Sequence, residues 1–261
     1  LGRIYPTYDD LVHYIPHTDI EQKMLGAVTY GVTVDPHDRR PFALAFWFVD
    51  ASGDIYFYKD YPIQLMTDVK SCDLTVEDYA KMILEEQKGL RNQKITYFLG
   101  DPNKFPTVRK TYLYAGQTLI DDFAQEGLFF DVEINDSIAE GHRTVRGDYL
   151  YYDIEKEMSA TNKPKMFVST ECNNIHAAMM KSIDFKNSPK VFVSERCGNI
   201  NTAMNRYTWD EKKSKVVASE VPHEKYKDHA DCVRYTCIKH PVWIAPGEDT
   251  CYTPSVRGRI Y

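Results

Sequence analysis

Two aspartates each follow a short apolar run at a point where a strand should end. Gly31-Val32-Thr33-Val34 leads to Asp35, and Pro36 then prevents further donation to a sheet ladder. Ile95-Thr96-Tyr97-Phe98-Leu99 is halted in the same way by Gly100-Asp101-Pro102. Carboxylate oxygens are the hard ligands that Mg²⁺ and Mn²⁺ prefer. If the two strands are parallel neighbours, both carboxylates emerge at one edge of a sheet, where open α/β sheets usually carry their sites.

A third acidic segment lies towards the C-terminal end of the sequence. The run Lys227-Asp228-His229-Ala230-Asp231-Cys232-Val233-Arg234-Tyr235 predicts a helix whose first turn is acidic, as a helix N-terminus favours. Asp228 lies three residues before Asp231, so both can reach one face of that helix. Taken singly, each also fits a helix cap or a solvated surface group. Asp38, close to Asp35, is an auxiliary candidate that also suits a turn.

The residues between Asp35 and Asp101 predict an antiparallel meander followed by a crossover. The apolar runs 42–49 and 55–58 are separated by Asp50-Ala51-Ser52-Gly53-Asp54, which favours a tight turn. From Thr75 apolar residues recur at helical spacing, with Thr75 and Asp78 as a capping pair and Gly89 at the end. A strand, helix and strand in this order usually place the two strands parallel.

The rest of the chain continues this alternation. A second helix is indicated by Leu119, Ile120, Phe123 and Ala124, with Gly127 at its end and a further strand at 128–132. Residues 164–179 recur as 189–204, and each copy predicts a short strand followed by a helix. Residues 1–30 carry no sustained period and suit an extended lead-in. The predicted fold class is α/β, with a mixed central sheet flanked by helices.

Composition restricts the class of protein. With 261 residues and 43% hydrophobic content the chain can bury a full core, in one large domain or two small ones. No apolar run approaches the roughly 18 residues that span a bilayer, and no targeting segment is apparent, so we expect an intracellular protein. A net charge of −6 is unusual for a nucleic-acid enzyme. Two bound divalent cations would offset part of it.

Other chemistries find little support in the sequence. The six cysteines form no CxxC pair, so we expect reduced and largely buried thiols. A zinc site from His229, Cys232, Cys237 and His240 is conceivable, but the spacing matches no common pattern. Neither a GxxxxGK[ST] phosphate loop nor a GxGxxG turn occurs, and no Ser-His-Asp or Cys-His arrangement stands out.

Several segments together carry a resemblance to a known family. They are Pro189-Lys190-Val191-Phe192-Val193, Cys197, Ile200, Tyr207-Thr208-Trp209-Asp210 and the run 227–235. With them, nearly the whole chain resembles the nuclease domain of the large terminase subunits of tailed bacteriophages, within the RNase H-like (RuvC-like) nuclease superfamily. The opening Gly2-Arg3-Ile4-Tyr5-Pro6 and His13 resemble the segment that joins the ATPase motor to that nuclease.

The resemblance implies roles for individual residues. Asp35, Asp101 and Asp231 match the three catalytic, metal-binding acids, with Asp228, His229 and Asp38 as auxiliaries. The family commonly has two residues between the His and the final Asp, whereas Ala230 alone stands there in this sequence. That difference rotates His229 about 100° around a helix. It leaves Asp228 as an alternative to Asp231, whose spacing to Arg234-Tyr235 is kept.

The resemblance also implies an activity and its partners. It implies a metal-dependent endonuclease that cuts concatemeric viral double-stranded DNA with little sequence preference, with a two-metal site for Mg²⁺ or Mn²⁺. The implied partners are DNA, an ATPase motor domain of the same polypeptide, the portal, the small terminase subunit and the procapsid, in the host cytoplasm without a membrane. The implied division is a lead-in at 1–28, a nuclease domain at 29–250 and a tail at 251–261.

Basic residues near the predicted strand ends are candidates for phosphate contacts, although many charges of this kind are merely solvated. They are Arg39, Arg40, Lys104, Arg109, Lys110, Arg143 and Arg146. Two other hypotheses use the same residues differently. The chain could be another RNase H-like DNA enzyme, such as a junction resolvase or transposase, or a non-catalytic module that docks on DNA or the portal.

Overall fold

The computed structural model describes most of the chain outside residues 170–226. The described ranges are 8–63, 72–91, 93–108, 116–134, 137–153, 155–156, 159–163, 165–169 and 227–246. The second copy of the repeat, most of the first copy, the opening Gly2–Pro6 segment and the tail 251–261 lie outside these ranges. So do Arg109 and Lys110 among the basic candidates.

A six-stranded mixed sheet forms the centre of the fold, in the order β1-β6-β4-β3-β2-β5. The strands are β1 Tyr14–Ile15, β2 Thr29–Asp35, β3 Ala43–Val49, β4 Ile55–Tyr61, β5 Ile95–Gly100 and β6 Met166–Ser169. Strands β2, β3 and β4 form the predicted antiparallel meander. Strand β5 pairs parallel to β2, as the predicted crossover requires, and β6 pairs parallel to β4.

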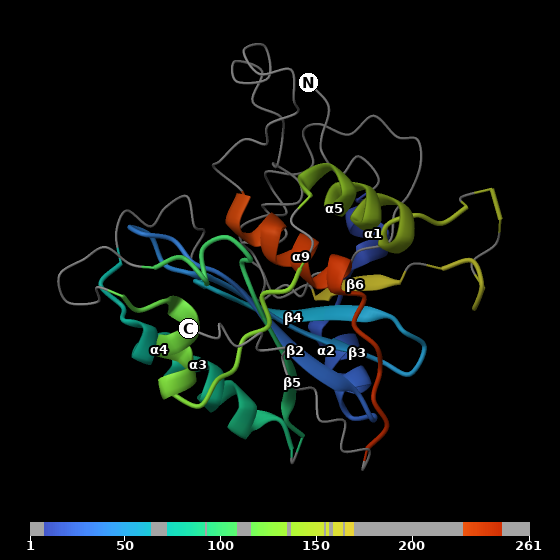
Figure 1. Cartoon of the computed structure of the whole chain (residues 1–261). Coiled ribbons are helices and arrows are strands. Elements are labelled where there is room, and N and C mark those ends of the chain that lie inside the picture. The colour runs from blue at the N-terminus through green and yellow to red at the C-terminus, as the bar shows by residue number, and fades with distance from the viewer. Residues whose placement is uncertain are drawn as a thin grey trace, which may run out of the picture.

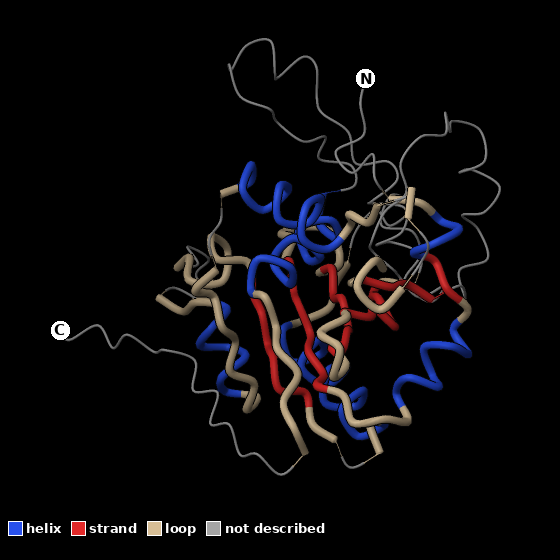
Figure 2. Tube along the Cα trace, turned by 90° about the vertical axis from the view of Figure 1, so that its right-hand side faces the viewer, coloured by secondary structure: helices blue, strands red, loops and turns tan. Residues whose placement is uncertain are grey.

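Helices cover both faces of this sheet (Figure 1). They are α1 Asp10–His13, α2 His17–Met24, α3 Val76–Gly89, α4 Leu119–Gln125, α5 Ile138–Thr144, the π-helical turn η1 Val145–Tyr149 and α9 Lys227–Lys239. Helices α5 and α9 lie above the sheet in Figure 1 and α3 and α4 below it, and Figure 2 shows the strands between helices from the side. The predicted α/β class, a mixed sheet flanked by helices, is confirmed.

Side-chain alternation along the strands builds two cores. On one face Ala45, Trp47 and Phe57 pack in one cluster with residues of α9 and η1. On the other face Val32 and Phe46 pack with residues of α2, α3 and α4. Because successive residues of a strand point to opposite faces, the alternation in β2 places Gly31, Thr33 and Asp35 together on the α9 face.

The helix between β2 and β5 begins and ends where the sequence predicts. Thr75 Oγ1 accepts from the backbone N–H of Asp78, and the Asp78 carboxylate accepts from the backbone N–H of Thr75, which is the predicted capping pair. Gly89 is the last residue of α3. The same reciprocal pair, Thr118 with Asp121, begins α4.

Two expectations differ from the structure. The run 128–132 is not a ladder strand: Asp131 makes an isolated parallel bridge to Leu99. Residues 8–28 are not an extended lead-in, since they contain α1, β1 and α2, and β1 pairs with β6. Ile20 of α2 is fully buried in the core.

The domain boundaries themselves stay a prediction. Among the described residues, no helix has the length and apolar character needed to cross a membrane.

Substitution of Gly31, in the centre of β2, tests how tightly the face of the sheet that contacts α9 is packed. A Cβ atom there would lie 2.2 Å from Cζ2 of the buried Trp47, whose Nε1 donates to Thr33 Oγ1. We expect Gly31→Ala to lower the free energy of unfolding by about 1–3 kcal/mol, because the indole must move. Gly89→Ala is the matched control, since a Cβ there meets nothing within 4 Å. Chemical denaturation followed by tryptophan fluorescence measures both, and equal stability of the two variants would contradict the packing described.

Candidate functional site

The parallel pairing of β2 with β5 brings Asp35 and Asp101 to the same edge of the sheet. Val34 is paired with Gly100 in the ladder, so the residues that follow each of them are neighbours. The backbone N–H of Asp101 donates to the carbonyl oxygen of Val34 at 3.2 Å, which fixes the two strand ends to each other. This juxtaposition is the one that the strand–helix–strand pattern predicts.

Asp35 is completely buried, and its two oxygens have different surroundings. Oδ1 accepts from Lys104 Nζ at 2.6 Å, whereas Oδ2 has no hydrogen-bond partner among the described residues. Burial raises the pKa of Asp35, Lys104 opposes this, and the negative charges of Asp228, Asp231 and Asp101 raise it further. A buried carboxylate that has acidic neighbours, and one oxygen without a hydrogen-bond partner in the described ranges, favours the binding of a cation.

The loop after β5 is shaped by Asp101 itself. Its Oδ1 accepts from the backbone N–H of Asn103 at 2.7 Å and of Lys104 at 3.0 Å, so the chain turns back towards β2. Lys104 Nζ thereby donates to the carbonyl oxygen of Pro36 at 2.6 Å as well as to Asp35. Burial works against the charge of Lys104, but the carboxylates of Asp35 and Asp101 raise its pKa overall.

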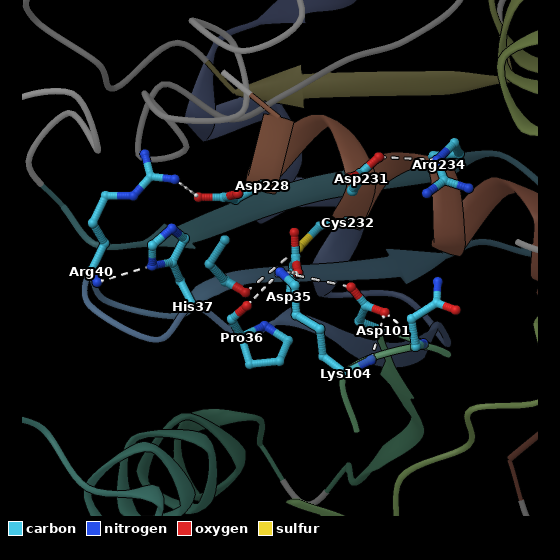
Figure 3. Close-up of polar contacts among 12 residues, drawn as sticks. Asp35, Pro36, His37, Arg40, Asp101, Lys104, Asp228, Asp231, Cys232 and Arg234 are labelled. Atoms are coloured by element: carbon cyan, nitrogen blue, oxygen red, sulfur yellow. Dashed lines mark hydrogen bonds and ion pairs between the residues drawn. The ribbon is translucent and has the colours of Figure 1, made fainter. Parts of the chain in front are cut away.

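Residues spaced four apart along α9 form a stripe that faces β2 and continues past the end of that strand. Thr236 Oγ1 lies 2.7 Å from Thr33 Oγ1, and one turn earlier Cys232 Sγ donates to the carbonyl oxygen of Ala43, the residue paired with Asp35. Asp228 occupies the next position of this stripe, because residues four apart share a helix face. Asp228 lies near Asp35, and its Oδ2 pairs with Arg40 Nη2 at 3.1 Å (Figure 3).

Asp231 also lies near Asp35, but its carboxylate is directed towards Arg234 (Figure 3). Its Oδ1 accepts from Arg234 Nε at 3.0 Å, and both side chains are almost completely buried. Arg234 packs closely over Gly141 of α5, where a Cβ atom would lie 2.7 Å from Arg234 Cδ. Asp231 therefore takes part in the packing of α9 on α5.

His229 and the other members of the conceivable zinc set do not gather. His229 Nε2 donates to the carbonyl oxygen of Tyr61 at 2.9 Å, and burial lowers its pKa to about 4. Cys237 Sγ contacts the sulfur of Met166, and His240 Nδ1 lies 3.1 Å from the hydroxyl of Tyr149. Cys232 faces β3 instead. The described cysteines, Cys72, Cys232 and Cys237, are all free thiols, as expected.

A cavity of about 1170 Å³ opens beside the carboxylates, between the loop after β2, the start of α3, the loop after β5 and α4. Asp228, Lys104 and Pro36 lie in its wall on the side of the site. Its far wall is acidic, with Glu77, Asp122 and Glu126 among the lining residues. The cavity thus meets the carboxylate cluster at Asp228. Asp38 is exposed and also lines this cavity.

His37 is a site residue that the sequence analysis missed. Its Nδ1 accepts from the backbone N–H groups of Arg39 and Arg40, both at 3.1 Å, so the imidazole holds the loop between β2 and β3 in shape. With Nδ1 accepting, Nε2 carries the proton of the neutral ring. His37 lines the cavity. The sequence signal for His37 was its position two residues after Asp35, in the turn that must follow the predicted end of the strand.

The basic candidates lie in different surroundings. Lys104 and Arg40 contact acids of the cluster, and Arg39 is exposed on the loop between β2 and β3. Arg143 is 80% exposed on α5 and pairs with Glu140, whereas Arg146 Nε donates to the carbonyl oxygen of His142. Of these five, only Lys104 and Arg40 therefore contact carboxylates of the site within the described part of the chain.

The donor set fits a divalent cation in its chemistry. Asp35, Asp101 and Asp228 supply carboxylate oxygens from three elements, and the buried Asp35 Oδ2 has no other partner among the described residues. In the present arrangement, no three His, Cys, Asp or Glu side chains of the described ranges are close enough to form a ready-made metal-binding group. Lys104, Arg40 and Arg234 hold the carboxylates instead.

Comparison with known proteins identifies the fold through solved structures. The large terminase of a thermophilic bacteriophage, in complex with ATP-gamma-S, matches with a TM-score of 0.58 and 16% sequence identity, over 90% of this chain and 45% of that chain. The P22 large terminase nuclease domain matches with a TM-score of 0.53 and 13% identity, over 94% of this chain and 95% of that chain. The chain thus spans less than half of the thermophilic phage terminase. No family model and no curated protein matches the sequence.

The Asp231–Arg234 pair provides a test of the packing of α9 on α5. We expect Arg234→Met to lower the free energy of unfolding by about 3–5 kcal/mol, since it leaves a buried carboxylate without this partner. Arg143→Met is the control from the exposed i,i+3 pair on α5 and should change stability by less than about 1 kcal/mol. Urea unfolding measures both variants. A loss below about 1 kcal/mol for Arg234→Met would contradict a structural role of the pair.

Proposed function

We propose that this chain is a metal-dependent DNA endonuclease of the large-terminase type, which cuts concatemeric viral double-stranded DNA during genome packaging. The observation that carries the proposal is the buried Asp35 carboxylate, with one oxygen lacking a hydrogen-bond partner in the described ranges, beside Asp101 and Asp228. The fold that carries these acids is shared with the P22 large terminase nuclease domain. The strand ends and the resemblance support the same two positions, Asp35 and Asp101.

Hydrolysis of a phosphodiester requires an activated water and a stabilised leaving oxygen, and Mg²⁺ or Mn²⁺ at such carboxylates supplies both. Asp35 would serve as a metal ligand, because it is the last residue of β2 and is buried beside the other acids. Asp101 presents Oδ2 to the site, while its Oδ1 holds the turn that follows. Arg40 and Lys104 lie beside the acids on the cavity side. There their positive charges are suited to contact phosphate oxygens of DNA, and such contacts do not depend on the base sequence.

The third carboxylate comes from α9, where two residues compete. The resemblance implies Asp231, whose spacing to Arg234 and Tyr235 matches the family. The stripe through Thr236 and Cys232 supports Asp228, which lines the cavity, whereas Asp231 Oδ1 accepts from buried Arg234. We therefore assign the third ligand to Asp228 and give Asp231 a positioning role through the packing of α9.

The remaining partners follow from the proposed role. The terminase of the thermophilic bacteriophage was solved with ATP-gamma-S bound and is more than twice as long as the part of it that this chain matches. We propose that an ATPase motor domain belongs to the same polypeptide as this chain. The portal, the small terminase subunit and the procapsid would be its packaging partners.

Plasmid cleavage tests the catalytic assignment. With Mg²⁺ or Mn²⁺ the intact chain should cut supercoiled and linear duplex, and Asp35→Asn or Asp101→Asn should lower the rate at least about 100-fold, because each removes a ligand charge. Asp19→Asn, on the exposed face of α2, is the control and should cut as well as the wild type.

Two results would contradict this assignment. Equal rates for Asp35→Asn and the wild type would exclude the carboxylates as the catalytic centre. Activity on branched DNA without activity on duplex would favour a junction resolvase.

Asp228→Asn and Asp231→Asn separate the two candidates for the third ligand. We expect Asp228→Asn to weaken Mn²⁺ binding by about 10- to 100-fold while stability changes little, because Asp228 lies at the cavity. Asp231→Asn should chiefly lower the free energy of unfolding, because it breaks the buried pair with Arg234. Calorimetric Mn²⁺ titration and urea unfolding of both variants provide the comparison. The reverse pattern would assign the ligand to Asp231.

A further inference from the structure

Lys104 brings a positive charge into the carboxylate cluster, although its side chain is 38% exposed. Its Nζ lies 2.6 Å from Asp35 Oδ1, 2.6 Å from the carbonyl oxygen of Pro36 and 3.8 Å from Asp101 Oδ2. Oxygens from the ends of two neighbouring strands therefore converge on one ammonium group (Figure 3). Two carboxylates and a backbone carbonyl are also an oxygen set that hard divalent cations use.

The backbone around Lys104 does not depend on the contact that its ammonium makes. The turn is held by Asp101 Oδ1, which accepts from two backbone N–H groups, one of them that of Lys104. The stem of Lys104 lines the cavity, so the side chain has space to rotate away from Asp35. Withdrawal of the ammonium thus requires a change of side-chain rotamer and leaves the turn in place.

We propose that the Lys104 ammonium is a resident counter-ion, which holds the place of a divalent cation between Asp35 and Asp101 and leaves when that cation binds. This inference rests on the proposed function, because it assigns metal binding to these carboxylates. An ammonium and a divalent cation that both contacted Asp35 Oδ1 would repel each other at a separation of about 4 Å, so binding of the cation favours withdrawal of the ammonium. The displaced ammonium then lies on the cavity wall, where a substrate phosphate is the ligand that suits it.

Lys104 therefore acts on the site in two opposite ways. Without metal it neutralises a buried carboxylate that has acidic neighbours, so it stabilises the fold. With metal it competes for the same oxygen, so it weakens metal binding. A residue that merely bound DNA would change neither the stability of the metal-free protein nor its affinity for the metal alone.

Calorimetric titration of the DNA-free chain with Mn²⁺ distinguishes these roles. We expect Lys104→Met to bind Mn²⁺ at least about tenfold more tightly than the wild type, which corresponds to about 1.4 kcal/mol. Lys104→Arg keeps the charge and should bind like the wild type. Lys81→Met, from an exposed ion pair on α3, is the control and should bind unchanged.

Thermal unfolding provides a second readout that does not depend on cleavage. Lys104→Met should have a lower Tm than the wild type without metal and a larger rise of Tm at saturating Mn²⁺, because ligand that binds the folded state stabilises it more as its affinity increases. If Lys104→Met does not fold without metal, Lys104→Gln keeps a neutral donor to Asp35 and allows the same comparison.

The outcomes separate this inference from the proposed function. If the wild type binds Mn²⁺ and cuts DNA while Lys104→Met binds Mn²⁺ equally or more weakly, the counter-ion role is overturned and the nuclease assignment stands. If the wild type neither binds Mn²⁺ nor cuts DNA, both are overturned. Tighter binding by Lys104→Met with unchanged binding by Lys104→Arg supports the role.

Discussion

The parallel pairing of β2 with β5 is the interaction on which the site depends. It places two carboxylates at one edge of the sheet, and the face on which Asp35 points buries it completely under α9. A buried carboxylate beside other acids is unfavourable unless positive charge is close by. Lys104, carried by the loop that Asp101 shapes, supplies that charge. The sheet register, the loop and the ion pair therefore form one unit, and disturbing any of them alters the environment of Asp35.

The contacts that α9 makes with the sheet decide which of its acidic side chains lies at the edge of the site. These contacts run through Thr236 and Cys232, and this stripe reaches Asp228 at the edge of the site. Asp231 lies outside the stripe and is paired with Arg234 over Gly141 of α5. The resemblance favours Asp231 and the contacts of α9 favour Asp228, so the third ligand stays a prediction.

The sequence predicted those parts of the fold whose signals are local. The strand ends at Asp35 and Asp101 and the capping pair at Thr75 depend on residues close together in the chain, and the parallel direction of β5 follows from the order of the elements. The short strand β1 and the bridge at Asp131 were not predicted correctly, because tertiary pairing decides both of them. The contact of Lys104 with Asp35 spans 69 residues, and nothing in the spacing of either residue indicates it. The metal preference and the third ligand stay predictions for the same reason.

The net charge of −6 is less of an obstacle to a polyanionic substrate than composition suggests. Lys104 and Arg40 are engaged by Asp35 and Asp228, so neither charge is fully available to a phosphate. If a divalent cation takes over the carboxylates, both basic groups are released at the wall of the cavity. Binding of metal and binding of DNA then assist each other to the same extent, since a coupling free energy between two sites is reciprocal. Affinity for DNA would thus reside largely in the metal-loaded protein, whatever its total charge.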